Sequence, residues 1–224
     1  METITSRQNP LMTHIRRLAG SAAYRRQTGQ CLCDSPKLLR EAAQWGAEVQ
    51  TVVSVEPWPE PLPEKVRQVL VPPEVMASIS PAKTPQGVLF TCRAPVLPVP
   101  ETLPGRRYVV LDGVQDPGNV GTLLRSAAAF GFDGVLLSDG CASVFAPKTL
   151  RASMGAAVRI PVIEAGKMPE AIALLREKGI TCLAAALYQS QPLSAAASSY
   201  PDGVCVVIGS EGQGLTDETI AACN

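Results

Sequence analysis

Two glycine-rich segments carry the side chains that could do chemistry. The first runs from Asp112 to Gly121, is dense in turn-forming residues, and precedes a predicted helix that carries Arg125. Asn119 and Gly121 are expected at the start of that helix, where an asparagine caps free N–H groups. The Arg125 side chain leans back toward the same point and can reach a polyanion over the loop. Taken alone, the segment is more typical of a capped turn with a surface arginine.

The second segment runs from Gly209 to Gly214, between a predicted strand and a helix that Thr216 or Asp217 would cap. Three glycines in six residues allow a ligand to approach the backbone closely, and Glu211 places one negative charge among them. Neither segment matches the dinucleotide fingerprint or the Walker pattern. Ordinary nucleotide-binding folds are therefore disfavoured, and each segment alone is a weak signal.

The elements that must position these segments alternate regularly in the C-terminal half. Strands are expected over 108–111, 134–138, 181–187 and 204–208, and helices over 122–130, 146–154, 169–178 and 216–223. Such alternation predicts an α/β fold in which helices cover both faces of a parallel sheet. Ligands bind beyond the carboxyl ends of such strands, here after Leu111, Leu187 and Ile208.

Four prolines between residues 95 and 104 predict an extended linker over 94–105. This boundary divides the chain into an N-terminal domain, 1–93, and a C-terminal domain, 106–224. In the first, helices over 36–45 and 73–78 and strands over 49–55 and 88–92 indicate a small α/β unit.

Composition narrows the classes of function. The 224 residues are 46% hydrophobic but only 4% aromatic, which favours α/β layers. Seven cysteines without a C-x-x-C pair, together with a single histidine, His14, disfavour a metal site and a Ser-His-Asp hydrolase. No run of 18 apolar residues and no signal-peptide pattern occurs, so we expect a cytoplasmic protein without a membrane segment.

Charge is balanced overall but concentrated locally. The formal net charge is zero, yet the first thirty residues carry five arginines against the single acidic residue Glu2: Arg7, Arg16, Arg17, Arg25 and Arg26. The cluster is either a solvated helix face or a patch that contacts phosphates, and composition leaves both open.

In combination the two segments resemble the SpoU family of RNA ribose 2′-O-methyltransferases. D-P-x-N-x-G-x-x-x-R ends at Arg125 and resembles that family's first motif, while G-S-E-G-x-G-L begins at Gly209 and resembles the second. The stretch 146–156 between them is similar to the family's P-K-x-x-R-A-S-x-G-A sequence. The N-terminal half resembles the family's substrate-binding domain through 5–10, 36–38 and 84–87.

The resemblance implies S-adenosylmethionine as cofactor and a ribose 2′-hydroxyl of structured RNA as acceptor, with ribosomal RNA favoured over transfer RNA. It implies Arg125 and Asn119 as catalytic residues, with Glu211 orienting one of them. The cofactor would contact Gly209, Gly214, Ala185 and Leu187, and the five N-terminal arginines would contact RNA. It further implies a SPOUT α/β-knot domain and a homodimer.

Two departures from the family pattern remain. Leu32–Lys37 stands where relatives often read L-V-E-G-P-K. The third motif is expected just after residue 224, so the methyltransferase domain is expected to lack its last knot segment. An RNA-binding homologue without catalysis therefore remains an alternative, whereas a dinucleotide-dependent oxidoreductase is disfavoured by the absent fingerprint.

Overall fold

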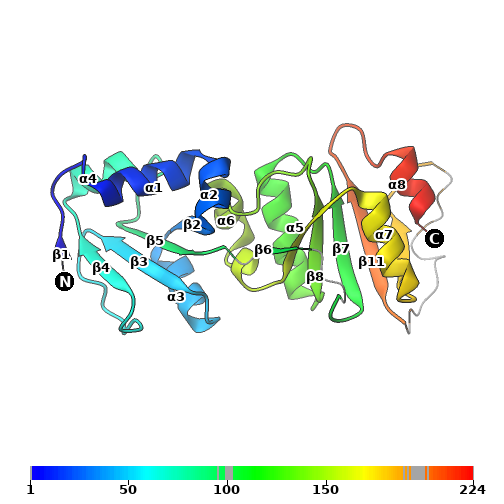
Figure 1. Ribbon diagram of the computed structural model, residues 1–224, viewed down its shortest axis with the longest axis horizontal. Coiled ribbons are helices and arrows are strands. Elements are labelled where there is room, and N and C mark those ends of the chain that lie inside the picture. The colour runs from blue at the N-terminus through cyan, green and yellow to red at the C-terminus, as the bar shows by residue number, and fades with distance from the viewer. Residues whose placement is uncertain are drawn as a thin grey trace. The chain divides into compact units, whose positions relative to one another are not determined.

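A computed structural model describes residues 2–94, 96–98, 103–188, 190, 192, 200 and 202–223. The chain forms two compact units (Figure 1). Unit 1 comprises Met1–Ala94 together with Ser143–Arg159, and unit 2 comprises Pro95–Ala142 together with Ile160–Asn224. Each unit is therefore built from two separate stretches of sequence. No helix in the described ranges is long and apolar enough to span a membrane.

Unit 1 is a five-stranded sheet with helices, in the strand order β1-β4-β3-β5-β2. Strands β1, β4 and β3 are parallel, and β5 is antiparallel to both β3 and β2. On α1, Met12, Ile15 and Leu18 share one face and are fully buried against the sheet. The elements of this unit are β1 (Glu2–Thr3), α1 (Pro10–Gly20), α2 (Ala22–Thr28), β2 (Gln30–Asp34), α3 (Pro36–Gln44), β3 (Val49–Ser54), β4 (Arg67–Leu70), α4 (Pro73–Ile79), β5 (Val88–Arg93), α6 (Pro147–Ser153) and the 3-10 turn η1 (Ala156–Val158).

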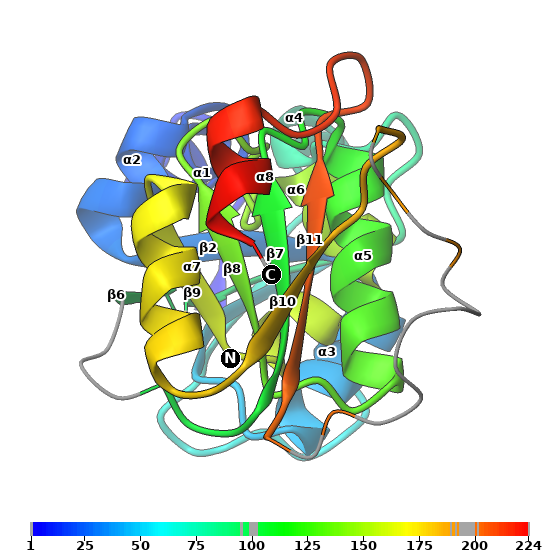
Figure 2. The same cartoon turned by 90° about the vertical axis from the view of Figure 1, so that its right-hand side faces the viewer.

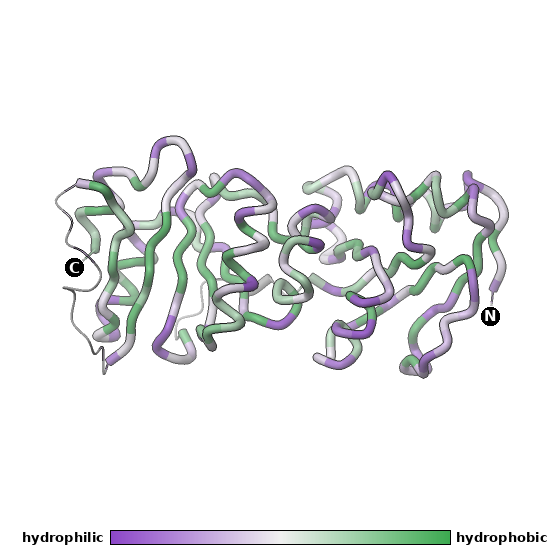
Figure 3. Tube along the Cα trace, turned by 180° about the vertical axis from the view of Figure 1, so that it is seen from behind, coloured by the Kyte–Doolittle hydropathy of each residue, from purple (hydrophilic) through white to green (hydrophobic). Residues whose placement is uncertain are grey.

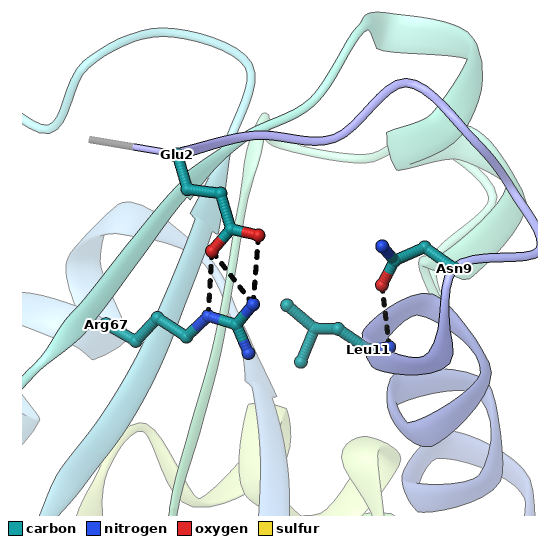
Figure 4. A network of polar contacts seen from close by, with 4 residues as sticks. All are labelled: Glu2, Asn9, Leu11 and Arg67. Carbon is teal, nitrogen blue, oxygen red and sulfur yellow. Dashed lines mark hydrogen bonds and ion pairs between the residues drawn. The ribbon is translucent and has the colours of Figure 1, made fainter.

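Two local contacts fix the start of the chain in this unit (Figure 4). Arg67 on β4 donates from Nε and Nη2 to the Glu2 carboxylate on β1 at 2.8–3.0 Å, which reinforces the parallel pairing of the two strands. Asn9 Oδ1 accepts the Leu11 N–H at 2.9 Å and caps α1, while Pro10 occupies the first helical position. Because the Arg67–Glu2 ion pair is half-exposed, we expect it to stabilise the fold less than the Asn9 cap of α1 does.

Unit 2 is a six-stranded parallel sheet in the order β10-β11-β7-β8-β9-β6. Helix α5 covers one face, and α7 with α8 covers the other (Figure 2). The strands are hydrophobic along their length and the connecting loops hydrophilic, as a sheet covered on both faces requires (Figure 3). The elements are β6 (Val96–Pro98), β7 (Arg107–Asp112), α5 (Pro117–Ala129), β8 (Gly134–Ser138), β9 (Val162–Gly166), α7 (Met168–Glu177), β10 (Thr181–Ala184), β11 (Val204–Gly209) and α8 (Asp217–Ala222).

The predicted α/β fold with a parallel C-terminal sheet is confirmed, but individual elements differ from the prediction. In unit 1, helices α1 and α2 and strands β1, β2 and β4 were not predicted. Helix α5 begins at Pro117, five residues before the prediction, because Asp116 caps it and Pro117 suits the first turn. Strand β10 ends at Ala184, three residues short of the prediction. Strands β6 and β9 were not predicted, and β6 lies within the expected linker, of which residues 95 and 99–102 fall outside the described residues.

Candidate active site

The candidate site lies at the point in the parallel sheet from which the chain continues first to one side, through β8 and β9, and later to the other, through β10 and β11. β7 occupies the interior of the sheet, with β8 on one side and β11, the last strand in sequence, on the other. Gly209 at the end of β11 is paired with Asp112 at the end of β7, so the loops that follow both strands emerge side by side. This is the topological switch point at which open α/β sheets bind ligands.

The loop after β7 is organised by Asp116. Its Oδ1 accepts the N–H groups of Gly118 at 2.7 Å and Asn119 at 3.0 Å, satisfying two donors of the first helical turn. Asn119 is thus inside the first turn of α5, and the expectation that it caps the helix is wrong. Its side chain is free of that task and turns to the neighbouring loop.

Glu211 joins the two loops. Its Oε1 accepts the Asn119 Nδ2–H at 2.8 Å and the Asp116 N–H at 3.2 Å, and its Oε2 accepts the Gln115 N–H at 3.2 Å. The hydrogen bond from Asn119, followed by those from backbone N–H groups, lowers the pKa of Glu211 to about 2. The two motifs therefore meet through an ionised carboxylate, which orients Asn119, one of the two partners expected for Glu211.

The loop after β11 is closed on itself. Ser210 and Gly214 exchange backbone hydrogen bonds of 3.0 and 2.9 Å, and Gly214 has a φ of 70°. A Cβ atom on Gly209 would lie 2.2 Å from the Gly214 carbonyl carbon, so only glycine fits there. Thr216 Oγ1 accepts the Thr219 N–H at 3.1 Å, which makes Thr216 the cap of α8. The loop geometry that presents Glu211 depends on these glycines.

A pocket of about 210 Å³ opens between the two loops. Apolar side chains form part of its wall, and Asn119, Gly209 and Glu211 contribute the polar part; the lining residues are Val114, Asn119, Thr122, Leu123, Ile208, Gly209 and Glu211. Arg125 follows Thr122 by three residues on α5, so the two side chains are neighbours on the same face of the helix. Its side chain is exposed and makes no hydrogen bond or ion pair with any described residue.

The remaining residues expected at the cofactor lie apart from this pocket. Ala185 and Leu187 follow β10, and the Ala185 N–H donates to the Val207 carbonyl at 2.9 Å. Leu187 is 89% exposed and, like Ala185 and Gly214, does not line the pocket. The expected strand over 181–187 was too long because the apolar run Ala184–Leu187 continues past the last ladder pair.

Four of the five N-terminal arginines reach the surface of unit 1. Arg7, Arg17 and Arg26 are exposed, and Arg16 is partly exposed. Arg25 is 7% exposed, and its Nη1 donates to the Leu18 carbonyl at 2.7 Å. The expectation that Arg25 contacts phosphate is corrected, because burial directs its guanidinium into the end of α1.

Three cysteines form a cluster that sequence spacing did not reveal. Cys31 and Cys33 alternate along β2, and Cys92 is paired with Cys31 across β5, so the three buried Sγ atoms lie within 4.8 Å of one another. The Cys-x-Cys spacing indicates that Cys31 and Cys33 share one face of a strand. Cys92 joins them only through the pairing of β2 with β5, which the spacing does not indicate. All seven cysteines are free thiols.

A parallel sheet whose polar side chains gather beyond the carboxyl ends of its switch-point strands has the architecture of an α/β enzyme. The SpoU rRNA methylase family model matches residues 106–224, and the MRM3-like substrate binding domain matches residues 9–89. The chain belongs to the SpoU rRNA methylase family.

Individual relatives agree with this membership. The chain is 32% identical to an uncharacterized tRNA/rRNA methyltransferase of Synechocystis sp., over 96% of this chain and 80% of that protein. It is 28% identical to a 23S rRNA guanosine 2′-O-methyltransferase of Bacillus subtilis, over 85% of this chain and 75% of that protein. The crystal structure of an AdoMet-bound rRNA methyltransferase from Sinorhizobium meliloti is 25% identical and superposes with a TM-score of 0.83, covering 98% of this chain and 85% of that one.

Proposed function

We propose that the protein transfers a methyl group from S-adenosylmethionine to a ribose 2′-hydroxyl of structured RNA, with ribosomal RNA as substrate. The observation that carries the proposal is the bridge from Glu211 to Asn119, which joins the two motif loops near Arg125, whose exposed guanidinium has no partner among the described residues. Family membership supplies the reaction class, and the Bacillus subtilis relative is named for 2′-O-methylation of 23S rRNA.

The chain's own residues account for positioning and charge. A guanidinium stays protonated, so Arg125 is a poor base but a good ligand for a phosphate and for a forming alkoxide. In the proposed reaction it holds the RNA backbone and stabilises negative charge on the 2′-oxygen, whose proton is taken up by phosphate, by water or by a transiently neutral arginine. Asn119, held by Glu211, is the second polar group of this surface, and most of the acceleration comes from placing the oxygen in line with the methyl group.

The lining of the pocket suits the proposed cofactor. When bound, S-adenosylmethionine supplies a methyl group on a positively charged sulfur. The ionised Glu211 carboxylate, the apolar side chains Val114 and Ile208, and the open backbone at Gly209 fit such a cation. We propose Gly209 as a cofactor contact within this pocket, and Gly214, Ala185 and Leu187, which do not line it, as contacts of a cofactor that extends beyond it.

We further propose residues 1–93 as the RNA-binding domain, 94–105 as its connection and 106–224 as the methyltransferase domain. The matches over 9–89 and 106–224 support these limits. Arg7, Arg16, Arg17 and Arg26 would contact phosphates, which positions RNA without reading its sequence.

The test is transfer of a labelled methyl group from S-adenosylmethionine to total RNA of a strain that lacks the gene. We expect label in the ribosomal RNA fraction, at a nucleotide whose 3′ phosphodiester resists alkaline cleavage, and transfer reduced by about 100–1,000-fold with an Arg125→Ala variant. Label in transfer RNA alone would show that the substrate is transfer RNA and not ribosomal RNA. Binding of RNA without any transfer would support the non-catalytic alternative.

We also propose a cytoplasmic homodimer. Seven free thiols fit a reducing compartment. Unit 2 exposes the large apolar side chains Phe130, Leu187 and Tyr188, which a second copy would cover. Light scattering on the purified protein measures the assembly directly, and a monomer at micromolar concentration would exclude the dimer.

A further inference from the structure

Unit 1 contains a pocket that the proposed reaction does not use. It has a volume of about 310 Å³, within the range of small-ligand sites. Three stretches meet around it: the start of α3, the loop that holds Thr84 and Gln86, and the end of α6. These are the stretches 36–38, 84–87 and 146–156 that the sequence singles out, and none of them contributes to the pocket at Glu211.

The charged groups of this pocket neutralise one another. Arg151 donates from Nη1 to the Asp34 carboxylate, which is only 7% exposed. Burial raises the pKa of Asp34, against the lowering effect of Arg151. Lys37 lies 4.0 Å from Glu41 one helical turn away. With two cations and two carboxylates so paired, the pocket offers little excess positive charge to a phosphate.

Uncharged recognition groups are left open. The Thr84 hydroxyl and the Gln86 amide are exposed and make no hydrogen bond with described residues. The amide carries donors and an acceptor side by side. Leu38, Leu150 and Met154 form the apolar wall, and Met154 is 42% exposed. Leu38 and Leu150 are only 4% and 1% exposed, so Met154 presents most of the apolar surface, next to the hydrogen-bonding groups of Thr84 and Gln86.

Backbone strain is concentrated at the same place. Among the described residues, two that are not glycine have a positive φ: Ser35 at 132° and Met154 at 49°. Both line this pocket. Residues are held in such conformations where the surrounding structure fixes them, and these positions cluster at ligand sites.

We propose that this pocket binds an unpaired nucleobase of the RNA substrate. The base would lie against the exposed side chain of Met154 while Gln86 and Thr84 hydrogen-bond its edge, and its phosphates would remain in solvent. A neutral, flat heterocycle with donors and acceptors on its rim matches the lining, since single-stranded RNA is read by stacking and by base edges. The identity of the ligand as part of an RNA rests on the proposed function.

The experiment uses the full chain labelled with ¹³C at the methionine methyl groups. Met154 reports on the pocket, whereas Met12 and Met76 are buried in the core of the same unit and serve as internal controls. The probes are adenosine, guanosine, cytidine, uridine and inorganic phosphate, and Met154→Leu assigns the resonance. We expect at least one nucleoside to shift the Met154 signal, with Met12 and Met76 unchanged. Absence of a shift with all four nucleosides, or an equal shift with phosphate alone, would overturn the inference.

Gln86→Ala tests the reading of the base edge. Loss of a bidentate amide contact should weaken binding of the preferred nucleoside by about five-fold or more. Lys83→Ala is the matched control, because Lys83 is exposed in the same loop but does not line the pocket. Unchanged affinity in Gln86→Ala, or an equal loss in Lys83→Ala, would refute the role of Gln86.

This readout is independent of catalysis. If nucleosides bind at Met154 but the protein transfers no methyl group, the nucleobase pocket is supported and the proposed function is rejected. Methyl transfer by a protein whose Met154 ignores every nucleoside would do the reverse.

Discussion

Replacing Gly209 by alanine is the sharpest perturbation of the candidate active site. The added Cβ would lie 2.2–2.4 Å from backbone atoms of Gly214 and Leu215. These are backbone atoms, so no side-chain rotation relieves the overlap. Bringing the closest pair to an ordinary 3.4 Å contact displaces the loop by about 1.2 Å. The two hydrogen bonds between Ser210 and Gly214 would stretch with it.

The displaced loop carries Glu211, which holds Asn119. Because a misplacement of about 1 Å at a reacting centre can cost roughly 100-fold in rate, we expect Gly209→Ala to lose about that factor in methyl transfer. Overpacking should lower the free energy of unfolding by only about 1–3 kcal/mol, so the protein stays folded. Single-turnover transfer and urea denaturation measure the two quantities separately.

The same loop offers controls. A Cβ on Gly212 meets nothing within 4 Å and the residue has no positive φ, so Gly212→Ala should be silent. Gly214 has open space but a φ of 70°, so Gly214→Ala should cost about 1 kcal/mol and a smaller share of activity. The reasoning is refuted if a folded Gly209→Ala protein keeps wild-type activity, or if Gly212→Ala is as damaging.

Four further predictions use other contacts. Arg125→Ala should reduce methyl transfer by about 100–1,000-fold with unchanged thermal stability, because the side chain is exposed and unpartnered among the described residues; parallel rate and melting measurements check this. The Glu211 contact, with a pKa depressed to about 2, should be fully present above the ordinary pKa near 4.5 and lost as pH falls through about 2, which carboxyl NMR titration would show. Arg151→Ala leaves the buried Asp34 carboxylate without its cation and should cost about 1–3 kcal/mol of unfolding free energy in urea. Arg17→Ala should reduce the salt dependence of RNA binding by about one counterion in an anisotropy titration; an unchanged slope would remove Arg17 from the interface.

Local sequence patterns determined most of the C-terminal fold. The boundaries of β8 were predicted without error, because Gly134 and the turn after Ser138 bracket a purely apolar run. β9 was missed because only Val162 and Ile163 are apolar before Glu164, and its pairing with β8 depends on contacts far apart in sequence. The β-strand propensity of single residues does not indicate which distant strand will pair with them.

The candidate site was predictable as a pair of loops but not as a geometry. The order of strands brings Asp112 and Gly209 together, and only that register explains why Glu211 reaches Asn119. Arg25 shows the opposite limit. Its charge predicted a surface contact, yet the carbonyl of Leu18 and the packing of α2 on α1 hold it inside.

The return of Ser143–Arg159 to unit 1 has a consequence for synthesis of the chain. Residues 95–142 must be translated before this segment, whose Thr149, Leu150 and Ser153 are buried, can complete the first unit. At about 5–20 residues per second, the wait from residue 94 to residue 159 is about 3–13 s. The first unit therefore cannot be completed until residues 95–142 of the second have been made, whereas the second still requires residues 160–224.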